Sequence, residues 1–168
     1  MKKILIVSAT KKTNYDLAKK LKKLIKSNIE ITLISLEDYI LPIYTEDEFE
    51  NKKETYKKTV ISLTNYFVQS DGIIICGPEY NGSTPPIINN SIAWISSSTK
   101  YWRDAFNNKI ALIGTSSGGQ GTKFITALKL QLEHLGCTVL PRTITTNSSN
   151  PLNTESAQKI LNRFIKLL

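Results

Sequence analysis

The sequence predicts a doubly wound α/β domain with a five-stranded parallel sheet and helices on both faces. Two observations predict this fold. The first is that short apolar runs rich in β-branched residues recur along the chain. The second is that segments of helical periodicity lie between these runs, as the crossover connections of parallel strands require. With 168 residues, 40% of them hydrophobic, the chain has the length of one domain and enough apolar residues for a core. We therefore expect residues 1–168 to form a single domain.

The first half of the chain contains three of the predicted strands. Residues 4–7 form a continuous apolar run, which is typical of a strand covered on both faces. From Thr13 leucines recur at helical spacing, and residues 29–34 return to a β-branched run. The segment 37–54 is acidic and lacks periodicity, so it predicts a long irregular loop. The helix expected after it, before a strand at 73–76, carries Tyr56, Val60, Leu63 and Phe67.

The second half of the chain continues the alternation. Proline suits the first turn of a helix, so a helix is expected to begin at Pro85 and Pro86. The later elements are a strand at 110–113, a Gly- and Ser-rich loop at 114–121, a helix from Ile125 that stops at Gly136, a short fifth strand at Val139 and Leu140, and a helix carrying Ala157, Ile160, Leu161, Phe164 and Leu168. Ligands of such sheets bind at the carboxyl ends of the strands. The loops after strands one, three and four are therefore the candidate site.

The charge pattern argues against a nucleic-acid or membrane protein. The net charge is +8, with 22 Lys+Arg against 14 Asp+Glu, and 19 of the basic residues are lysine. Seven lysines lie between Lys11 and Lys26, mostly opposite the leucines of the predicted helix, which indicates a solvated face. No aromatic residues interleave with them as in single-strand readers. The apolar runs are much shorter than the roughly 20 residues of a bilayer span. We expect a soluble, cytoplasmic protein with no nucleic-acid or membrane partner.

The cysteines and the single histidine carry little sign of chemistry. Cys76 lies in an apolar run, Cys137 follows a glycine, and the two have no C-x-x-C spacing, so we interpret both as buried thiols rather than reactive groups. His134 is late on the fourth helix, away from the strand-end loops, and is expected on the surface rather than as a general acid. No His/Cys/Asp cluster predicts a metal site.

The first candidate loop combines hydroxyls and lysines immediately before a helix. Such a loop can surround a phosphate, because the free N–H groups and the dipole of the helix favour an anion. A Thr13 or Asn14 side chain that caps the helix would explain the same residue types, and both explanations can hold together. Walker A and G-x-G-x-x-G sequences are absent, which argues against standard nucleotide loops. The candidate residues are Ser8, Thr10, Lys11, Lys12, Thr13 and Asn14.

The second candidate loop, residues 78–85, offers an aromatic ring, an amide, hydroxyls and backbone N–H groups within eight residues. These groups suit the polar edge of a planar ring, although Pro, Asn and Gly also serve a turn that binds nothing. The candidate residues are Pro78, Glu79, Tyr80, Asn81, Gly82 and Ser83.

The stretch PEYNGSTPPIINNSIAWIS, residues 78–96, resembles the signature of the NADPH-dependent FMN reductase family, a flavodoxin-like group that includes quinone, azo-dye and chromate reductases. The combination of the proline, Glu-Tyr-Asn and Trp94 is specific. The resemblance extends over nearly the whole chain through residues 41–44 (Leu-Pro-Ile-Tyr), Lys109 with the fourth strand, and residues 116–121. One departure is that Ser8-Ala9-Thr10-Lys11 stands where the family usually has Gly-Ser-x-Arg, and its Ser-x-Thr-x-x-Thr spacing is similar to the phosphate loop of flavodoxins.

The resemblance implies a flavodoxin-like fold that binds FMN noncovalently, with the phosphate in the first loop and the ring against the other two. NADPH or NADH would be the electron donor, and a quinone, an azo compound or free flavin the small-molecule electron acceptor. Lys11 or Lys12 would replace the family's arginine as a point charge. Glu79 would orient backbone or ring, and no side chain would act as a catalyst, since FMN carries the chemistry. The residues expected on the ring's other side are Ser116, Ser117 and Gly118.

Two questions stay open from the sequence. The aromatic residues Trp94, Tyr101, Trp102 and Phe106 indicate either a homodimer or homotetramer interface, as the family implies, or local packing. The alternatives to the enzyme are a flavodoxin-like electron carrier or flavin-binding module without direct NAD(P)H turnover, and a scaffold that has lost its flavin. The basic charge argues against the carrier, because flavodoxins are usually acidic. The altered first loop is what suggests the scaffold.

Overall fold

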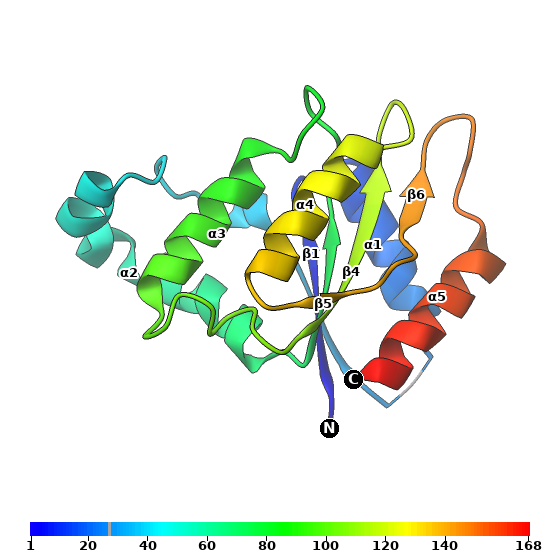
Figure 1. Ribbon diagram of the computed structural model, residues 1–168, viewed down its shortest axis with the longest axis horizontal. Helices are drawn as coiled ribbons and strands as arrows, with labels where there is room; N and C mark the ends of the chain where they lie inside the picture. The colour runs from blue at the N-terminus through cyan, green and yellow to red at the C-terminus, as the bar shows by residue number, and fades with distance from the viewer. Residues whose placement is uncertain (27) are drawn as a thin grey trace.

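The computed structural model describes residues 1–26 and 28–168, and in these residues it shows a parallel sheet with five α-helices (Figure 1). The strands are β1 (Lys3–Ser8), β2 (Glu30–Ser35), β3 (Gly72–Cys76), β4 (Ile110–Ser116), β5 (Thr138–Val139) and β6 (Ile144–Thr146). The helices are α1 (Thr13–Leu24), α2 (Glu46–Gln69), α3 (Pro86–Ser98), α4 (Thr122–His134) and α5 (Thr154–Leu167), with a 3-10 helix, η1 (Leu36–Asp38), after β2.

The strand order β2-β1-β3-β4-β5, with every pair parallel, confirms the predicted doubly wound sheet. It is the flavodoxin-like order, in which the winding direction switches between β1 and β3. The fifth position is shared by two segments, because β5 pairs with the first residues of β4 and β6 pairs with its last. Pro141 lies between these segments, and proline cannot donate to a strand ladder. The sequence predicted only the first of the two.

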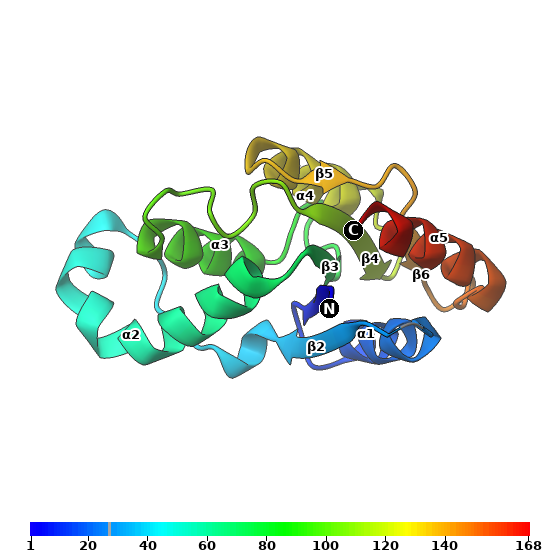
Figure 2. The same cartoon turned by 90° about the horizontal axis from the view of Figure 1, so that it is seen from below.

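The two faces of the sheet are covered by different helices (Figure 2). Alternate strand residues point to opposite faces. On β1, Ile4 and Ile6 pack with the apolar sides of α1 and α5, while Leu5 and Val7 pack in a second core with α2, α3 and α4. The lysines opposite the leucines of α1 are exposed, which confirms the solvated face.

Helix α2 begins earlier than predicted. The expected loop at 37–54 ends at Thr45, whose hydroxyl accepts a hydrogen bond of 3.0 Å from the Glu48 N–H and so caps the helix. The carboxylates of Glu46, Asp47 and Glu48 lie in the first turn, where the helix dipole favours them. The acidic character that suggested a loop is therefore the start signal of a helix.

Side chains of α3 hold the 41–44 segment in place. The amide of Asn90 donates to the Pro42 carbonyl at 2.9 Å and accepts from the Tyr44 N–H at 2.8 Å. The indole N–H of Trp94, which is fully buried, donates to the same Pro42 carbonyl at 2.9 Å. Two residues of the 78–96 stretch thus have a structural role outside the loop itself.

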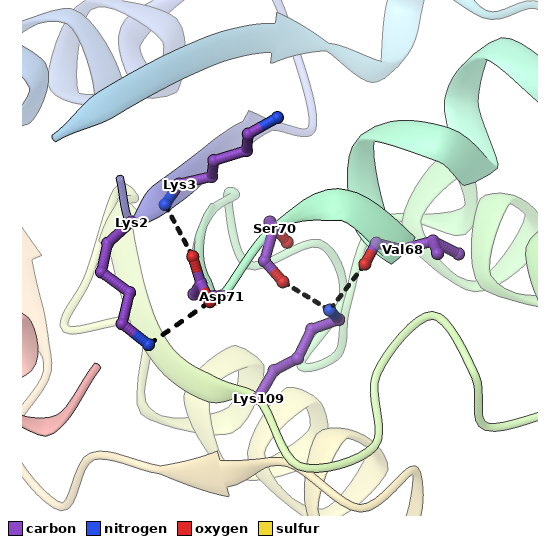
Figure 3. Close-up of polar contacts among 6 residues, drawn as sticks. All are labelled: Lys2, Lys3, Val68, Ser70, Asp71 and Lys109. Carbon is purple, nitrogen blue, oxygen red and sulfur yellow. Dashed lines mark hydrogen bonds and ion pairs between the residues drawn. The ribbon is translucent and has the colours of Figure 1, made fainter.

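A buried lysine joins elements at the amino ends of the strands (Figure 3). Lys109, which is 8% exposed, donates from Nζ to the Ser70 carbonyl at 2.5 Å and the Val68 carbonyl at 3.1 Å. Burial lowers the pKa of Lys109. The neighbouring Asp71 accepts the Lys3 N–H at 2.7 Å, and this hydrogen bond lowers the pKa of the carboxyl group. Through its bonds to the Val68 and Ser70 carbonyls, Lys109 caps the carboxyl end of α2, where carbonyls lack helical partners.

The expectations about the two cysteines and the histidine are confirmed. Cys76 and Cys137 are free and buried, and burial raises the pKa of each thiol to about 12. His134, the last residue of α4, is exposed beside the Trp102 ring. Across residues 1–26 and 28–168, each helix lacks the length or the apolar character needed to cross a membrane.

Candidate functional site

The loops that follow β1, β3 and β4 meet around one cavity of about 600 Å³. Figure 1 shows the loops after β3, β4 and β6 at the same end of the sheet, at the top of the view. Small-molecule sites in proteins have volumes of roughly 300–1,000 Å³. The cavity is lined by Thr10, Lys12, Thr13, Asn14, Pro78, Glu79, Tyr80, Ser116, Ser117, Gly118, Asn147 and Ser148. The structure thus brings together the three loops that the sequence singled out.

Two predicted residues of the first loop lie outside this lining. Ser8 is buried, and its hydroxyl donates to the Thr10 carbonyl at 2.7 Å, which shapes the loop. Lys11 is turned toward the segment after β2: its N–H donates to Glu37 Oε2 at 2.6 Å, and its ammonium pairs with Asp38. The hydrogen bond to Asp38 raises the pKa of Lys11. Lys12 is left as the lysine of this loop that lines the cavity.

Three predicted residues of the second loop, Asn81, Gly82 and Ser83, also lie outside the lining. Tyr80 and Ser83 exchange backbone hydrogen bonds of 3.1 and 3.0 Å across a two-residue turn. Asn81 has φ 49° and Gly82 has φ 73°, and positive φ at both central residues is the requirement of a type I′ turn. The turn explanation of this Asn-Gly pair therefore holds in the structure.

The start of α1 is not capped by a side chain. The helix begins at Thr13 with Lys12 in the N-cap position and no side-chain hydrogen bond to its free N–H groups, so the capping explanation for Thr13 and Asn14 is wrong. Asn14 is instead buried, 1% exposed, and makes two hydrogen bonds to Ser116. Its Nδ2 donates to the Ser116 carbonyl and its Oδ1 accepts the Ser116 N–H, both at 2.8 Å. The first and third candidate loops are thereby locked together, while the helix start stays open to an anion.

Glu79 connects the second and third candidate loops. Its backbone N–H donates to the Ser117 hydroxyl at 2.8 Å. Its carboxylate accepts the N–H groups of Lys123 at 2.9 Å and Phe124 at 3.3 Å. Helix α4 has Gly121 at its N-cap and hence no side chain of its own to cap it, so the Glu79 carboxylate caps it from another loop. Of the two roles expected for Glu79, orienting the backbone or orienting the ring, these hydrogen bonds show the first.

The residues of the cavity fit a phosphorylated planar molecule such as FMN. Thr10, Lys12 and Thr13 line the cavity at the open start of α1, and their hydroxyl and ammonium groups suit a phosphate. Tyr80, 49% exposed, supplies an aromatic face at the wall. A Cβ built on Gly118 would meet no protein atom within 4 Å, so neighbouring protein atoms do not require a glycine here. Because Gly118 lines the cavity, its missing side chain leaves space for a ligand.

Sequence reasoning missed a fourth loop, which supplies Asn147 and Ser148. These residues follow β6, the segment that was not predicted as a strand. The β-branched run of residues 144–146, followed by a polar turn, is the signal that could have found them. Within the described part of the chain, no three His, Cys, Asp or Glu side chains gather where they could hold a metal ion.

Residues 1–150 match the family model described as NADPH-dependent FMN reductase. An NADPH azoreductase from Bacillus sp. (strain OY1-2) is 26% identical over 119 residues, which cover 71% of this chain and 61% of that protein. A quinone reductase from Escherichia coli (strain K12) is 33% identical over 107 residues, 63% of this chain and 53% of that protein. The matched part of the chain thus spans less than two thirds of these curated relatives.

A solved structure agrees with the fold. The flavoenzyme NAD(P)H:(acceptor) oxidoreductase from Paracoccus denitrificans superposes with a TM-score of 0.80 at 24% sequence identity, covering 99% of this chain and 97% of that one. This likeness extends over the whole sheet and its helices, whereas the family model rests on the sequence itself. Because that model matches most of the length, the chain belongs to the NADPH-dependent FMN reductase family.

Proposed function

We propose that this chain is an FMN-dependent NAD(P)H oxidoreductase that passes hydride from NADPH or NADH to bound FMN and then to a small acceptor such as a quinone, an azo compound or free flavin. The observation that carries the proposal is that the loops after β1, β3 and β4 line one shared cavity, in a chain of this family. In sheets of this strand order, FMN is bound at the switch point between β1 and β3, which is where the cavity lies.

When bound, FMN supplies the redox chemistry, because its ring accepts and releases hydride. The chain's own residues bind and orient. Lys12, Thr10 and the open start of α1, which line the cavity, would hold the phosphate, and Tyr80 with the Gly118 backbone would contact the ring. Asn14 and Glu79 keep the loops at fixed distances through the hydrogen bonds described above. Alignment of two planar reactants in a preformed site is itself a large contribution to rate.

The proposal is tested by adding FMN to the flavin-free protein and then adding nicotinamide under anaerobic conditions. We expect quenching of FMN fluorescence on binding, loss of the yellow absorbance with NADPH or NADH, and its return when a benzoquinone is added. Binding without bleaching by either nucleotide would indicate the electron carrier instead. Failure to bind FMN would indicate the scaffold that has lost its flavin.

The two lysines of the first loop give a matched pair of variants. Lys12→Gln is expected to weaken FMN binding about threefold to tenfold, because it removes one exposed charge from the phosphate end. Lys11→Gln removes the same charge from the adjacent residue. Because the Lys11 ammonium pairs with Asp38, we expect less than about a twofold effect on FMN binding. Fluorescence titrations with FMN and with riboflavin check both. Equal losses in the two variants, or an equal loss for riboflavin, would contradict this assignment.

We also propose that the protein works in the cytoplasm as a homodimer or homotetramer. Tyr101 and Trp102 are 63% and 46% exposed, which supports an interface. Trp94 and Phe106 are instead fully buried in this chain's own core, so local packing accounts for them. Sedimentation at micromolar concentration measures the oligomeric state, and a monomer alone would exclude the assembly.

A further inference from the structure

A fourth loop reaches the candidate flavin cavity from the far side of β4. This loop, which we call the 147–150 turn, follows β6 and connects it to α5. Asn147 and Ser148 line the cavity together with the start of α1. Neither residue belongs to the stretches that resemble the reductase signature, so their role has to be read from the structure.

A second hollow beside the cavity shows where the turn lies relative to α1. This hollow, of about 240 Å³, lies between α1 and the segment that leads into α5. Thr13, Ser116 and Asn147 line both the hollow and the cavity. The turn therefore stands opposite the start of α1, at the end of the cavity where Lys12 and Thr13 suit a phosphate.

Asn147 builds the turn and ties it to the third candidate loop. Its Oδ1 accepts the N–H groups of Ser149 at 3.0 Å and Asn150 at 2.7 Å, and its Nδ2 donates to the Gly119 carbonyl at 3.3 Å. Both ends of its side-chain amide thus hold backbone groups. Ser148 differs, because it is exposed at the cavity wall and none of the hydrogen bonds that hold the turn uses its hydroxyl.

We propose that the 147–150 turn forms a fourth wall of the phosphate end of the flavin site, with the Ser148 hydroxyl donating a hydrogen bond to the phosphate. Asn147 is a positioning residue that acts through Ser148. The inference rests on the proposed function, since it needs FMN in the cavity. A phosphate contact from the 147–150 turn would also explain how the site can bind a phosphate when the first loop lacks the family's arginine.

The test compares FMN with riboflavin, which lacks the phosphate, by fluorescence titration. Ser148→Ala is expected to weaken FMN binding about threefold to tenfold, the effect of one hydrogen bond to a charged group, and to leave riboflavin binding unchanged. Ser149→Ala is the matched control, because Ser149 is the adjacent exposed serine and does not line the cavity. Asn147→Ala should lower FMN affinity to a similar extent. Because it acts through Ser148, the double variant should lose less than the sum of the two.

The outcomes separate this inference from the proposed function. If the unmodified chain binds FMN but Ser148→Ala binds it as tightly as Ser149→Ala does, the fourth wall is wrong and the proposed function stands. An equal loss for FMN and riboflavin in Ser148→Ala would also overturn the phosphate contact. If the unmodified chain binds neither flavin, the proposed function and this inference fail together. Melting temperatures of Ser148→Ala and Ser149→Ala, expected to be unchanged at these exposed positions, show that the fold is intact.

Discussion

Replacing Asn14 with alanine is expected to lower the free energy of unfolding by about 2 kcal/mol and to weaken FMN binding by about tenfold or more. The side chain is buried and makes two hydrogen bonds to the backbone of Ser116. Alanine leaves the Ser116 N–H and carbonyl without these partners, and an unpaired buried polar group costs more than the net value of its hydrogen bond. Thermal unfolding and FMN fluorescence titration measure the two effects.

The loss of affinity should follow from loosened geometry rather than from a lost ligand contact. Asn14 fixes the start of α1 to the end of β4, and both line the cavity. Riboflavin binding should therefore weaken as well, in contrast to the lysine and serine variants. Asn65→Ala on the exposed face of α2 is the matched control, and we expect it to change neither quantity. An Asn14→Ala protein as stable as Asn65→Ala would show that the link between the loops is not needed.

The alternation of apolar runs and helical patterns was enough to predict the sheet and the faces it buries. Strands such as β1 and β3 are covered on both sides, and continuous β-branched runs are the direct consequence. The start of α2 was missed because its acidic first turn carries a local capping signal rather than periodicity. The second part of the fifth strand, β6, was missed because a β-branched run of three residues is a short local signal, and its pairing with β4 is a contact between distant segments.

The candidate site was predicted at the level of loops, whereas the direction and the contacts of several of its side chains were not. Strand ends of a parallel sheet must meet at one edge, so the loops could be named in advance. Whether Lys11 or Lys12 faces the cavity depends on Glu37 and Asp38, which follow another strand. The side-chain amides of Asn14 and Asn147 donate to backbone carbonyls at the end of β4 and in the loop after it, which are distant from both residues in the sequence. Such contacts between distant segments leave no local pattern.

Replacing Lys109 with methionine is expected to lower the free energy of unfolding by about 2–3 kcal/mol, which corresponds to about 5–10 °C in melting temperature. Methionine keeps most of the side chain's length but leaves the carbonyls of Val68 and Ser70 at the end of α2 without their charged donor (Figure 3). Burial lowers the pKa of Lys109, so part of the gain from its hydrogen bonds is offset by the cost of removing the ammonium from water.

Flavin binding should not change in the Lys109→Met protein, which separates this residue from Asn14. Lys109 immediately precedes β4, and the cavity begins at the other end of that seven-residue strand, about 20 Å away. Lys129→Met makes the same chemical change at a lysine whose side chain is 40% exposed and pairs with the exposed Glu133, so about 0.5 kcal/mol or less is expected there. Equal melting temperatures for the two methionine variants would mean that the end of α2 is satisfied without Lys109. A loss of FMN affinity in Lys109→Met alone would mean that the amino ends of the strands control the geometry of the site.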